Sequence, residues 1–458
     1  MATLISTNPA KDYQKLGSVK VSTLSEIKKK VALANQAKKA WKELGAAKRA
    51  QILKSLYKAF KKHYAEMALL TTREMGRPIS ETLGDQAWDM SYFGQFLSEG
   101  PKYLQDEVTH QDKKGIHKIV YEPYGTTALI VPWNFPFANW LWGVIPTLVA
   151  GNVVVFKHSE ECPLMGKLID KIMAEAKLPK GIFSQVYGDG KVGEMLANQP
   201  VDLIWFTGSS AVGKKLFAIS GQKFIKSVME LGGSNPAVVF DDVKVDEIVD
   251  GLLWGRFANC GQVCDCIKRL LVHEKVAKEL VGRLKEKLEK LVIGDPEDKK
   301  TQIGSLVAKR QVDLLKDQVT DAVKKGAKVI TGGKEPQNLK GAYYLPTLLT
   351  NIKPNMRVWQ EEVFGPVLPM MAFKTEAEAV KLANETIYGL GAKVYSKDLK
   401  RARRVASKIQ AGCIDINQGN HWLSCNPFGG YKASGMGREH GRIGFQELTQ
   451  VKVVAEEK

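Results

Sequence analysis

From Thr126 onward, the chain alternates short apolar segments with amphipathic ones, and this alternation limits the possible folds more than any other feature. The first apolar set, in which a helix-like stretch follows each segment, consists of TTALIVPW, NVVVFKH, FSQVYG and LIWFTGS. A second set follows Gly232 and Gly233 and consists of PAVVF, RLLVHE, KVITGG, VLPMMAF, AKVYS and CIDIN. Parallel strands need crossovers, usually helices, which cover both faces of the sheet. The sequence therefore predicts an α/β fold with two parallel sheets, whose ligands bind beyond the carboxyl ends of the strands.

The segments outside this alternation predict other structure. Before it we expect three helices: one opening at the capping box Thr23-x-x-Glu26, one over residues 47–74 and one over residues 80–103. IHKIVYEPYG and the terminal LTQVKVV are short and partly polar, which indicates exposed strands. We expect these two strands to project and to pair with another subunit.

The formal net charge of +18 raises the question of nucleic-acid binding. Lys and Arg are spread along amphipathic helices, and no zinc-finger or homeodomain pattern accompanies them. We therefore expect a solvated basic surface and no nucleic-acid partner.

Membrane insertion and secretion are not expected either. The uncharged segment 126–156 contains Pro132, Pro136 and Pro146, and a lipid-exposed helix could not satisfy the backbone that they break. The opening residues lack the basic and apolar segments of a signal peptide, and the six cysteines are scattered. These features predict a cytoplasmic protein.

Two glycine-containing turns are candidates for binding a phosphate. Residues 188–193 match G-x-G-x-x-G, but no acidic residue follows at the spacing of a dinucleotide fingerprint, so an ordinary strand-to-helix turn is expected there. In residues 206–213 an apolar strand runs into small residues and then a helix, whose free N–H groups suit a pyrophosphate. A helix merely capped by a serine is the alternative.

Three cysteines, Cys260, Cys264 and Cys266, lie within the ten residues FANCGQVCDC. Their spacing, without a nearby histidine, does not fit a tetrahedral metal site, so no metal is expected. Cys264 follows a turn-like opening and is the candidate for a reactive thiol facing a cleft between the two sheets. A helix start or nearby amide donors would lower the pKa of such a thiol.

Seven motifs, in the same order and at similar spacing, resemble those of the aldehyde dehydrogenase superfamily. They are PWNFP (132–136), GNVVVFKHSE (151–160), FTGS (206–209), MELGGSNP (229–236), FANCGQVC (257–264), EEVFGPV (361–367) and NPFGGYKASGMGRE (426–439). Because they span essentially the whole chain, the resemblance concerns the entire fold.

The resemblance implies two Rossmann-like domains and a small β arm. An NAD-binding domain would comprise residues 1–106, 125–232 and 432–444, and a catalytic domain residues 233–431. Residues 107–124 and 445–458 would form an oligomerisation arm, so self-association as a dimer or tetramer is expected.

The resemblance also implies catalytic roles. Cys264 would attack the aldehyde carbonyl, and the Asn134 amide together with the Cys264 N–H would stabilise the developing oxyanion. Glu230 would activate the water that hydrolyses the thioester. Glu439 would pass the proton outward; an ordinary surface carboxylate is the alternative for this residue.

The implied cofactor is NAD rather than NADP. A carboxylate at Glu160, beside Lys157, would accept from the 2′-hydroxyl of the adenosine ribose and repel a 2′-phosphate, although such Lys–Glu pairs are also common on protein surfaces. The other implied cofactor contacts are Trp133, Gly208, Ser209, Gly213, Glu362 and Phe364.

Two positions distinguish this chain from succinate-semialdehyde dehydrogenases, which it otherwise resembles. Trp142 and Ala258 stand where those enzymes usually carry arginines for the distal carboxylate. The aromatic candidates for the substrate pocket, Trp142, His421, Trp422 and Phe428, instead favour an uncharged or aromatic aldehyde. Gly143 also departs from the lysine of many relatives.

Several alternatives stay open. Succinate-semialdehyde oxidation is supported by the Cys264-x-Cys266 spacing, which in those enzymes can form a reversible disulfide, although Cys266 can equally be a small core residue. A non-catalytic binding or structural protein on the same scaffold is the alternative from another class.

Overall fold

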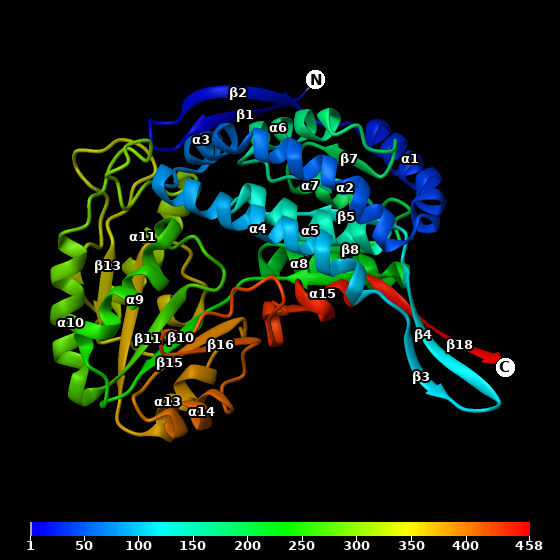
Figure 1. Ribbon diagram of the computed structural model, residues 1–458. Helices are drawn as coiled ribbons and strands as arrows, with labels where there is room; N and C mark the ends of the chain where they lie inside the picture. The colour runs from blue at the N-terminus through cyan, green and yellow to red at the C-terminus, as the bar shows by residue number, and fades with distance from the viewer. Residues whose placement is uncertain (1) are drawn as a thin grey trace.

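The computed structural model describes residues 2–458 and contains two large sheets, each covered by helices on both faces (Figure 1). The predicted α/β fold class is confirmed. Each sheet carries its own hydrophobic core: one core joins Trp41, Phe93 and Leu129, and the other joins Val238, Leu271 and Trp359. The site described below lies between these two halves.

The first sheet has six strands in the order β17-β9-β8-β5-β6-β7. Its strands are β5 (Thr126–Ile130), β6 (Val153–Lys157), β7 (Phe183–Val186), β8 (Leu203–Thr207), β9 (Lys226–Glu230) and β17 (Gly435–Met436). All neighbours are parallel except β17, which returns from the C-terminal part of the chain and pairs antiparallel with β9. β5 and β6 are fully buried, as expected for central strands covered on both faces.

The helices of this half pack against the six-stranded sheet and one another. They are α1 (Leu24–Glu43), α2 (Gly45–Lys62), α3 (Tyr64–Met75), α4 (Ile79–Tyr103), α5 (Pro136–Ala150), α6 (Pro163–Glu175), α7 (Gly190–Ala197), α8 (Ser210–Lys223) and α15 (Gly441–Glu447). α5 is buried along its whole length, which explains why the uncharged segment that includes it is apolar without being a membrane span.

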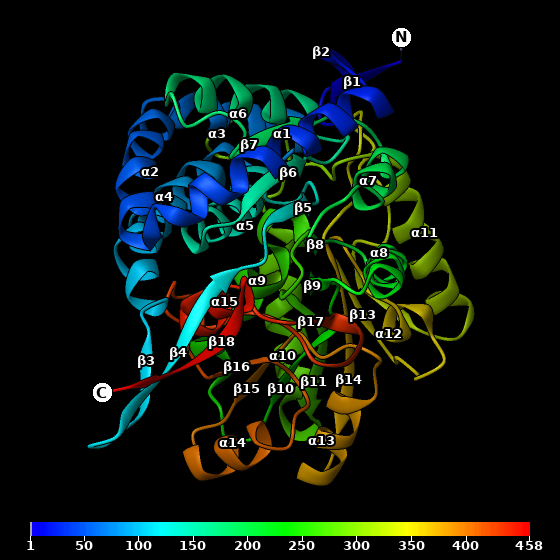
Figure 2. The ribbon, with the colours of Figure 1, turned by 90° about the vertical axis from the view of Figure 1, so that its right-hand side faces the viewer.

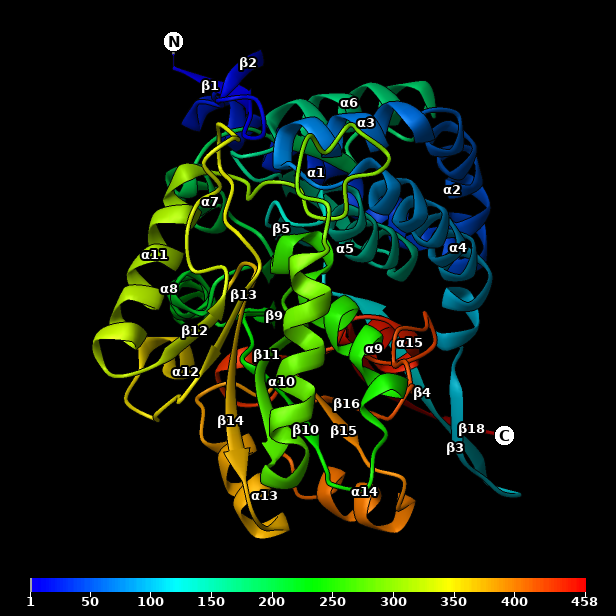
Figure 3. The same ribbon diagram turned by 90° about the vertical axis from the view of Figure 1, so that its left-hand side faces the viewer.

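The second sheet has seven strands in the order β12-β13-β14-β11-β10-β15-β16. Its strands are β10 (Asn235–Val239), β11 (Ile267–His273), β12 (Lys328–Thr331), β13 (Thr347–Thr350), β14 (Val367–Phe373), β15 (Gly391–Tyr395) and β16 (Cys413–Ile416). Its helices are α9 (Val245–Phe257), α10 (Glu274–Glu289), α11 (Lys309–Lys324), α12 (Arg357–Gln360), α13 (Glu376–Asn384) and α14 (Leu399–Ala406). Figure 3 shows α9 and α10 in front of this sheet. Two short 3-10 helices, Ala258–Gly261 and Lys432–Ser434, complete the helical elements.

Three strands form an arm that leaves the body of the molecule. β3 (Glu107–Gln111) and β4 (Gly115–Pro123) make a hairpin, and β18 (Thr449–Glu457) pairs antiparallel with β4 along its full length. Figures 1 and 2 show this ribbon projecting away from both large sheets. The two strands expected to be exposed therefore pair with each other within one chain.

The N-terminal region differs from the sequence prediction in two ways. Residues before the first helix form an unexpected hairpin of β1 (Thr3–Asn8) and β2 (Gln14–Lys20). The helix expected over residues 47–74 is two helices, α2 and α3, which meet at His63, where φ is −97° and ψ is 10°. In the second sheet, β12 pairs antiparallel with β13, which the parallel alternation did not predict.

The chain passes from the first sheet to the second between Glu230 and Asn235. As a result, the carboxyl ends of the first sheet face the amino ends of the second. Asn134 follows β5 and Glu230 ends β9, whereas Cys264 precedes β11. The expectation that ligands lie beyond the carboxyl ends of the strands thus applies to the first sheet only.

Candidate active site

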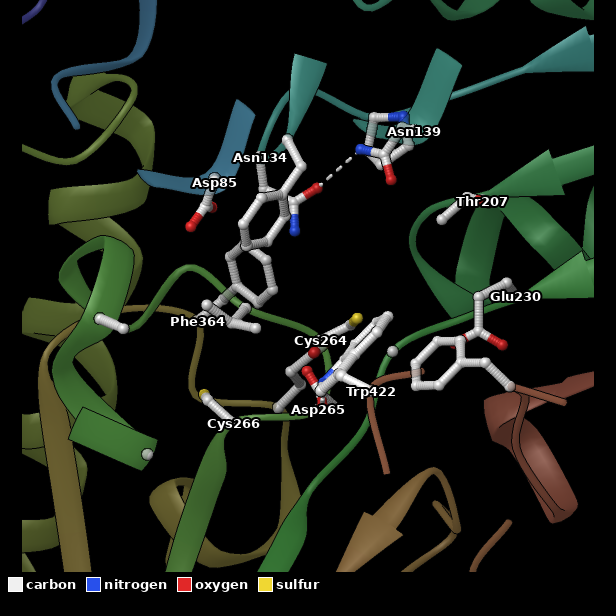
Figure 4. Close-up of a pocket in the computed structure, with 18 of the residues that line it drawn as sticks. Asp85, Asn134, Asn139, Thr207, Glu230, Cys264, Asp265, Cys266, Phe364 and Trp422 are labelled. Atoms are coloured by element: carbon white, nitrogen blue, oxygen red, sulfur yellow. Dashed lines mark hydrogen bonds between the residues drawn. The ribbon is translucent and has the colours of Figure 1, made fainter. Parts of the chain in front are cut away.

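A cavity of about 660 Å³ lies between the two halves (Figure 4). It is lined by fourteen of the residues expected to form the site: Trp133, Asn134, Trp142, Gly208, Ser209, Glu230, Cys264, Cys266, Glu362, Phe364, His421, Trp422, Phe428 and Glu439. In Figure 4 Cys264 lies between Asn134 on one side and Glu230 on the other.

Three expected cofactor residues lie outside the lining of this cavity: Lys157, Glu160 and Gly213. Lys157 is almost fully buried, and its Nζ donates to Glu160 Oε2 over 3.1 Å. Gly213 lies in the first turn of α8, where an added Cβ would come within 2.5 Å of the Leu231 side chain, so this glycine allows α8 to pack closely.

Cys264 is half-buried and belongs to an irregular segment before β11 rather than to a helix start. Burial raises the pKa of its thiol well above the usual range, and the charges of Asp265 and Glu230 add to this effect. The expectation that helix or amide dipoles would lower this pKa is therefore wrong. The thiol is protonated at neutral pH, so it must lose its proton as it reacts.

Asn134 is held by hydrogen bonds on several sides. Its Nδ2 donates to the carbonyl of Gln262 over 3.1 Å, and its Oδ1 accepts from Asn139 Nδ2 over 3.3 Å. Its backbone carbonyl accepts from Asn259 Nδ2 over 2.9 Å. These contacts leave one proton of the Asn134 amide for a ligand in the cavity.

Glu230 and Glu439 are both buried and face the same region. Burial and the neighbouring charge of Glu439 raise the pKa of Glu230 well above its usual range. Burial raises the pKa of Glu439 to about 8, against a hydrogen bond from Thr207 Oγ1 over 3.2 Å. Because Glu439 is only 5% exposed, it is not a surface carboxylate. A buried carboxyl with a pKa of about 8, such as Glu439, can take up and release a proton near neutral pH.

The cofactor side of the cavity contains a buried ion pair. Lys268 is fully buried; its Nζ forms an ion pair with Glu362 Oε1, which also accepts from the Gly233 N–H over 3.2 Å. An added Cβ at Gly232 would lie 2.2 Å from Glu362 Oε2, so only glycine leaves room for this carboxylate. This arrangement fixes an acceptor in the cavity, where it fits the hydroxyl groups of a ribose.

Two further features of this side fit a dinucleotide. Ser209 caps α8, with its side chain accepting from the Val212 N–H, so the positive end of that helix points to the cavity. Trp133 and Phe364 face each other edge to face, with ring centroids 5.5 Å apart.

Aromatic rings make up the opposite wall. Trp422 stacks on Trp142, with centroids 5.3 Å apart, and on Phe428, with centroids 4.5 Å apart. His421 continues the wall, and its ring is nearly parallel to that of Phe428. The four expected pocket residues therefore lie together.

Carboxylates that the motifs did not single out hold this wall in place. His421 Nδ1 contacts Asp415 Oδ1 at 3.1 Å, and His421 Nε2 lies 3.3 Å from Asp265 Oδ2. Burial would lower the pKa of His421, but the two carboxylates raise it to about 9. A signal for Asp265 was present, since it directly follows Cys264; Asp415 could be identified only from the fold.

Cys266 lines the same cavity but faces another way. Its sulfur accepts from Arg256 Nη1 over 3.0 Å and points away from the Cys264 sulfur in Figure 4. All six cysteines are free thiols. A bond between Cys264 and Cys266 would therefore require Cys266 to leave Arg256.

Residues 2–458 contain no group of three or more His, Cys, Asp or Glu side chains arranged to hold a metal ion. Within the same residues, no helix combines the length and the apolar character needed to cross a membrane.

Comparisons with known proteins show the family to which this chain belongs. The model of the aldehyde dehydrogenase family matches residues 2–454. The succinate-semialdehyde dehydrogenase [NADP(+)] GabD of Escherichia coli (strain K12) is 37% identical over 450 residues, which cover 97% of this chain and 92% of GabD. The betaine aldehyde dehydrogenase of Bacillus subtilis (strain 168) is 35% identical over 97% of this chain and 92% of its own length.

A solved structure shares both the fold and a third of the sequence of this chain. The NAD-dependent aldehyde dehydrogenase from Sinorhizobium meliloti superposes with a TM-score of 0.95 at 33% identity, covering 100% of this chain and 91% of that protein. The chain belongs to the aldehyde dehydrogenase family. It is thus an oxidoreductase of a family that uses NAD or NADP.

Proposed function

We propose that this chain oxidises an uncharged or aromatic aldehyde to the carboxylic acid, with NAD as the preferred cofactor. One observation supports this most directly: Cys264, Asn134 and Glu230 come from three distant parts of the chain and line one cavity. A thiol, an amide donor and a carboxyl around one space are the groups that acyl chemistry on a carbonyl needs.

In the first step Cys264 Sγ bonds to the aldehyde carbon. Because burial keeps the thiol protonated, its proton must leave during attack and passes to solvent water. The carbonyl oxygen then carries negative charge. The Asn134 amide proton and the Cys264 N–H stabilise this oxyanion, each donor contributing about 3 kcal/mol.

A dinucleotide held by Glu362 and by the start of α8 at Ser209 would supply the acceptor for the hydride of the substrate carbon, and Cys264 would then carry a thioester. Glu230 next takes a proton from the water that attacks this thioester, and Cys264 leaves as the acid forms. Glu439 receives the excess proton from Glu230. The pKa of Glu439, which burial raises to about 8, suits this exchange near neutral pH.

The preference for NAD rests on Glu160. Its carboxylate would accept from the 2′-hydroxyl of the ribose and repel a 2′-phosphate, while its bond to Lys157 fixes its position. Relatives use both cofactors, since GabD is named for NADP(+) and the Sinorhizobium enzyme for NAD. A higher kcat/KM with NADP than with NAD would contradict the proposal.

The substrate preference rests on the aromatic wall and on the lack of a free arginine in it. Trp142 and Ala258 line the cavity where an arginine would be needed for a distal carboxylate. Arg77 and Arg310 also line it, but Arg77 is engaged by Glu81 at 3.0 Å and by Asp85, and Arg310 is engaged by Glu161 at 2.6 Å. A carboxylate would therefore enter without a bidentate partner, at a cost of about 2 to 5 kcal/mol.

Succinate-semialdehyde oxidation is the second candidate. It is favoured by the 37% identity with GabD and by the presence of both Cys264 and Cys266.

A substrate panel distinguishes the two candidates. The kcat/KM for NADH formation should be measured with aliphatic, aromatic and ω-carboxylate aldehydes, with Cys264→Ala as the control for background. We expect the uncharged aldehydes to be the better substrates. Best turnover of succinate semialdehyde would contradict the substrate preference, and NADH formation by Cys264→Ala at the parent rate would contradict the mechanism.

Beyond this reaction, we infer that the three-stranded arm mediates self-association. The exposed valines of β18 and the projection of the arm in Figure 2 support this. The arm, residues 107–124 and 445–458, would then be separate from an NAD-binding domain of residues 1–106, 125–232 and 432–444 and a catalytic domain of residues 233–431.

A further inference from the structure

Asp265 is a buried carboxylate beside Cys264, and the reaction proposed above does not use it. It follows Cys264 directly, lines the same cavity, and its side chain is only 9% exposed. Burial would raise the pKa of Asp265, but the hydrogen bond and charge of His421 hold it below its usual value. The side chain is therefore an anion at neutral pH.

Only one of the two oxygens of Asp265 is engaged. Oδ2 accepts from Trp422 Nε1 over 2.8 Å and lies 3.3 Å from His421 Nε2. Across residues 2–458, neither a backbone amide nor a side chain donates to Oδ1. Oδ1 is therefore a charged acceptor that is free to bind a donor inside the cavity. Figure 4 shows Asp265 below Cys264 and next to the Trp422 ring, at the cavity.

The position of Asp265 next to Cys264 is unfavourable for a reactive thiol. The charge of Asp265 raises the pKa of the Cys264 thiol and so opposes its ionisation. Asp265 supports the wall through Oδ2, which contacts Trp422 and His421, but this role leaves Oδ1 unused. A free charged acceptor close to the reacting carbon instead suits a hydrogen-bond donor carried by the substrate itself.

The local charge balance favours a neutral donor. Asp265 and Asp415 are balanced by His421, held between them, and by Lys393, whose Nζ is 3.3 Å from Asp415 Oδ2. A substrate ammonium would add an unbalanced charge to this buried cluster and would have to lose its own hydration. A hydroxyl group can donate to Oδ1 without that cost.

Resting on the proposed aldehyde oxidation, we propose that Asp265 determines specificity by accepting a hydrogen bond on Oδ1 from a hydroxyl group of the aldehyde. Since Cys264 binds the carbonyl carbon and Asp265 is the next residue, the hydroxyl belongs on one of the first carbons after the carbonyl. The preferred substrates are then uncharged 2-hydroxy- or 3-hydroxyaldehydes. Trp142, Trp422 and Phe428 contact the remaining carbon chain.

The test compares isosteric pairs in the parent enzyme. The kcat/KM with NAD is measured for 2-hydroxypropanal against 2-methylpropanal and for 3-hydroxypropanal against butanal. A hydrogen bond to a charged acceptor predicts that at least one hydroxyaldehyde is favoured over its isostere by about 10- to 100-fold. Equal values in both pairs would overturn the proposal without any variant being needed.

Asp265→Asn separates recognition from support of the wall. A purely structural role would lower both members of a pair equally, whereas the proposal predicts that the hydroxy-to-alkyl ratio falls about tenfold or more. Hydration of the aldehydes in water is the same for both enzymes and cancels in this ratio. Asp415→Asn, which removes the other carboxylate from His421, is the matched control and should keep the parent ratio within about twofold.

Three outcomes are decisive. An unchanged ratio in Asp265→Asn would overturn the proposal. So would a preference for 3-aminopropanal over 3-hydroxypropanal that Asp265→Asn abolishes, because the site would then recognise a cation. If the parent forms no NADH from any of these aldehydes in a Cys264-dependent way, the proposed function itself is wrong.

Discussion

At the scale of single residues, Asn134 is held in position by its neighbours. Its amide is oriented by Gln262 and Asn139, which leaves one proton for the oxyanion. We expect Asn134→Ala to lower kcat by about 10²- to 10³-fold with little change in KM, because the donor acts mainly in the transition state.

Steady-state kinetics on the best aldehyde of the panel would check this expectation. Asn139→Ala is the matched control: it removes a contact to Asn134 Oδ1 but not the donor, so its effect should be smaller. A loss in Asn139→Ala as large as that in Asn134→Ala would argue against an oxyanion role.

His421 makes stability depend on pH. Its pKa is about 9 in the folded chain, against about 6.5 in an unfolded one, because Asp265 and Asp415 favour the charged ring. A folded pKa above the unfolded one means that this stabilisation is complete below about pH 6.5 and is lost as pH rises through about 9. The shift corresponds to at most about 3 kcal/mol.

Urea unfolding of the parent and of His421→Gln at pH 6.5 and pH 9.5 would measure this effect. The free-energy difference between the two proteins should shrink at the higher pH. A difference that stays constant or grows with pH would contradict the proposed ion pairs.

At the scale of elements, α6 is capped by a residue from another helix. Glu74 of α3 is buried; it accepts from the N–H groups of Leu164 and Met165 over 2.9 Å and 2.8 Å, and from Ser6 Oγ of β1 over 2.6 Å. Cys162, at the N-cap of α6, provides no side-chain cap. Glu74 therefore joins the N-terminal hairpin to the start of α6, just after Glu160.

Removing this cap should destabilise the fold. We expect Glu74→Ala to lower the free energy of unfolding by about 2 to 4 kcal/mol, since it leaves two buried N–H groups without an acceptor. Thermal unfolding with Glu66→Ala as the exposed control on α3 would test this. Equal melting temperatures for the two variants would contradict a capping role.

Several features of the elements could not be predicted from the sequence. The β1–β2 hairpin turns through Asp12 and Tyr13, both with positive φ, rather than through the glycine that usually indicates such a turn. The break at His63 lacks a glycine or proline, so the helical periodicity of residues 47–74 continues through it. The raised pKa of the Cys264 thiol depends on burial and on Glu230 from a distant strand.

The sequence motifs, by contrast, are sufficient to predict which residues meet in one cavity. The sequence predicts four catalytic residues that all line one cavity: Cys264, Asn134, Glu230 and Glu439. The departure at Gly143 also has a structural reason, since an added Cβ would lie 1.3 Å from the Trp205 ring, which fills the space above this position. Such a contact between distant residues is invisible in the sequence alone.

At the scale of the whole molecule, the arm offers an unpaired apolar face. Val451 and Val453 lie on the same face of β18 and are 62% and 67% exposed. We expect a double substitution of both valines by lysine to weaken self-association, because two charges would enter the contact between subunits.

Sedimentation velocity would measure the change in molecular mass. Val454→Lys, on the other face of β18, is the matched control and should keep the mass of the parent. A parent protein that sediments as a monomer would contradict the proposed role of the arm.

The central claim is that Cys264 forms a thioester that Glu230 then hydrolyses. The most direct measurement is the intact mass of Glu230→Gln after mixing with NAD and a preferred aldehyde, with NADH counted in the same sample. We predict about one NADH per chain and an added acyl group that peptide mapping assigns to Cys264. Formation of NADH with no acyl group on Cys264, or an acyl group on any other residue, would contradict the mechanism.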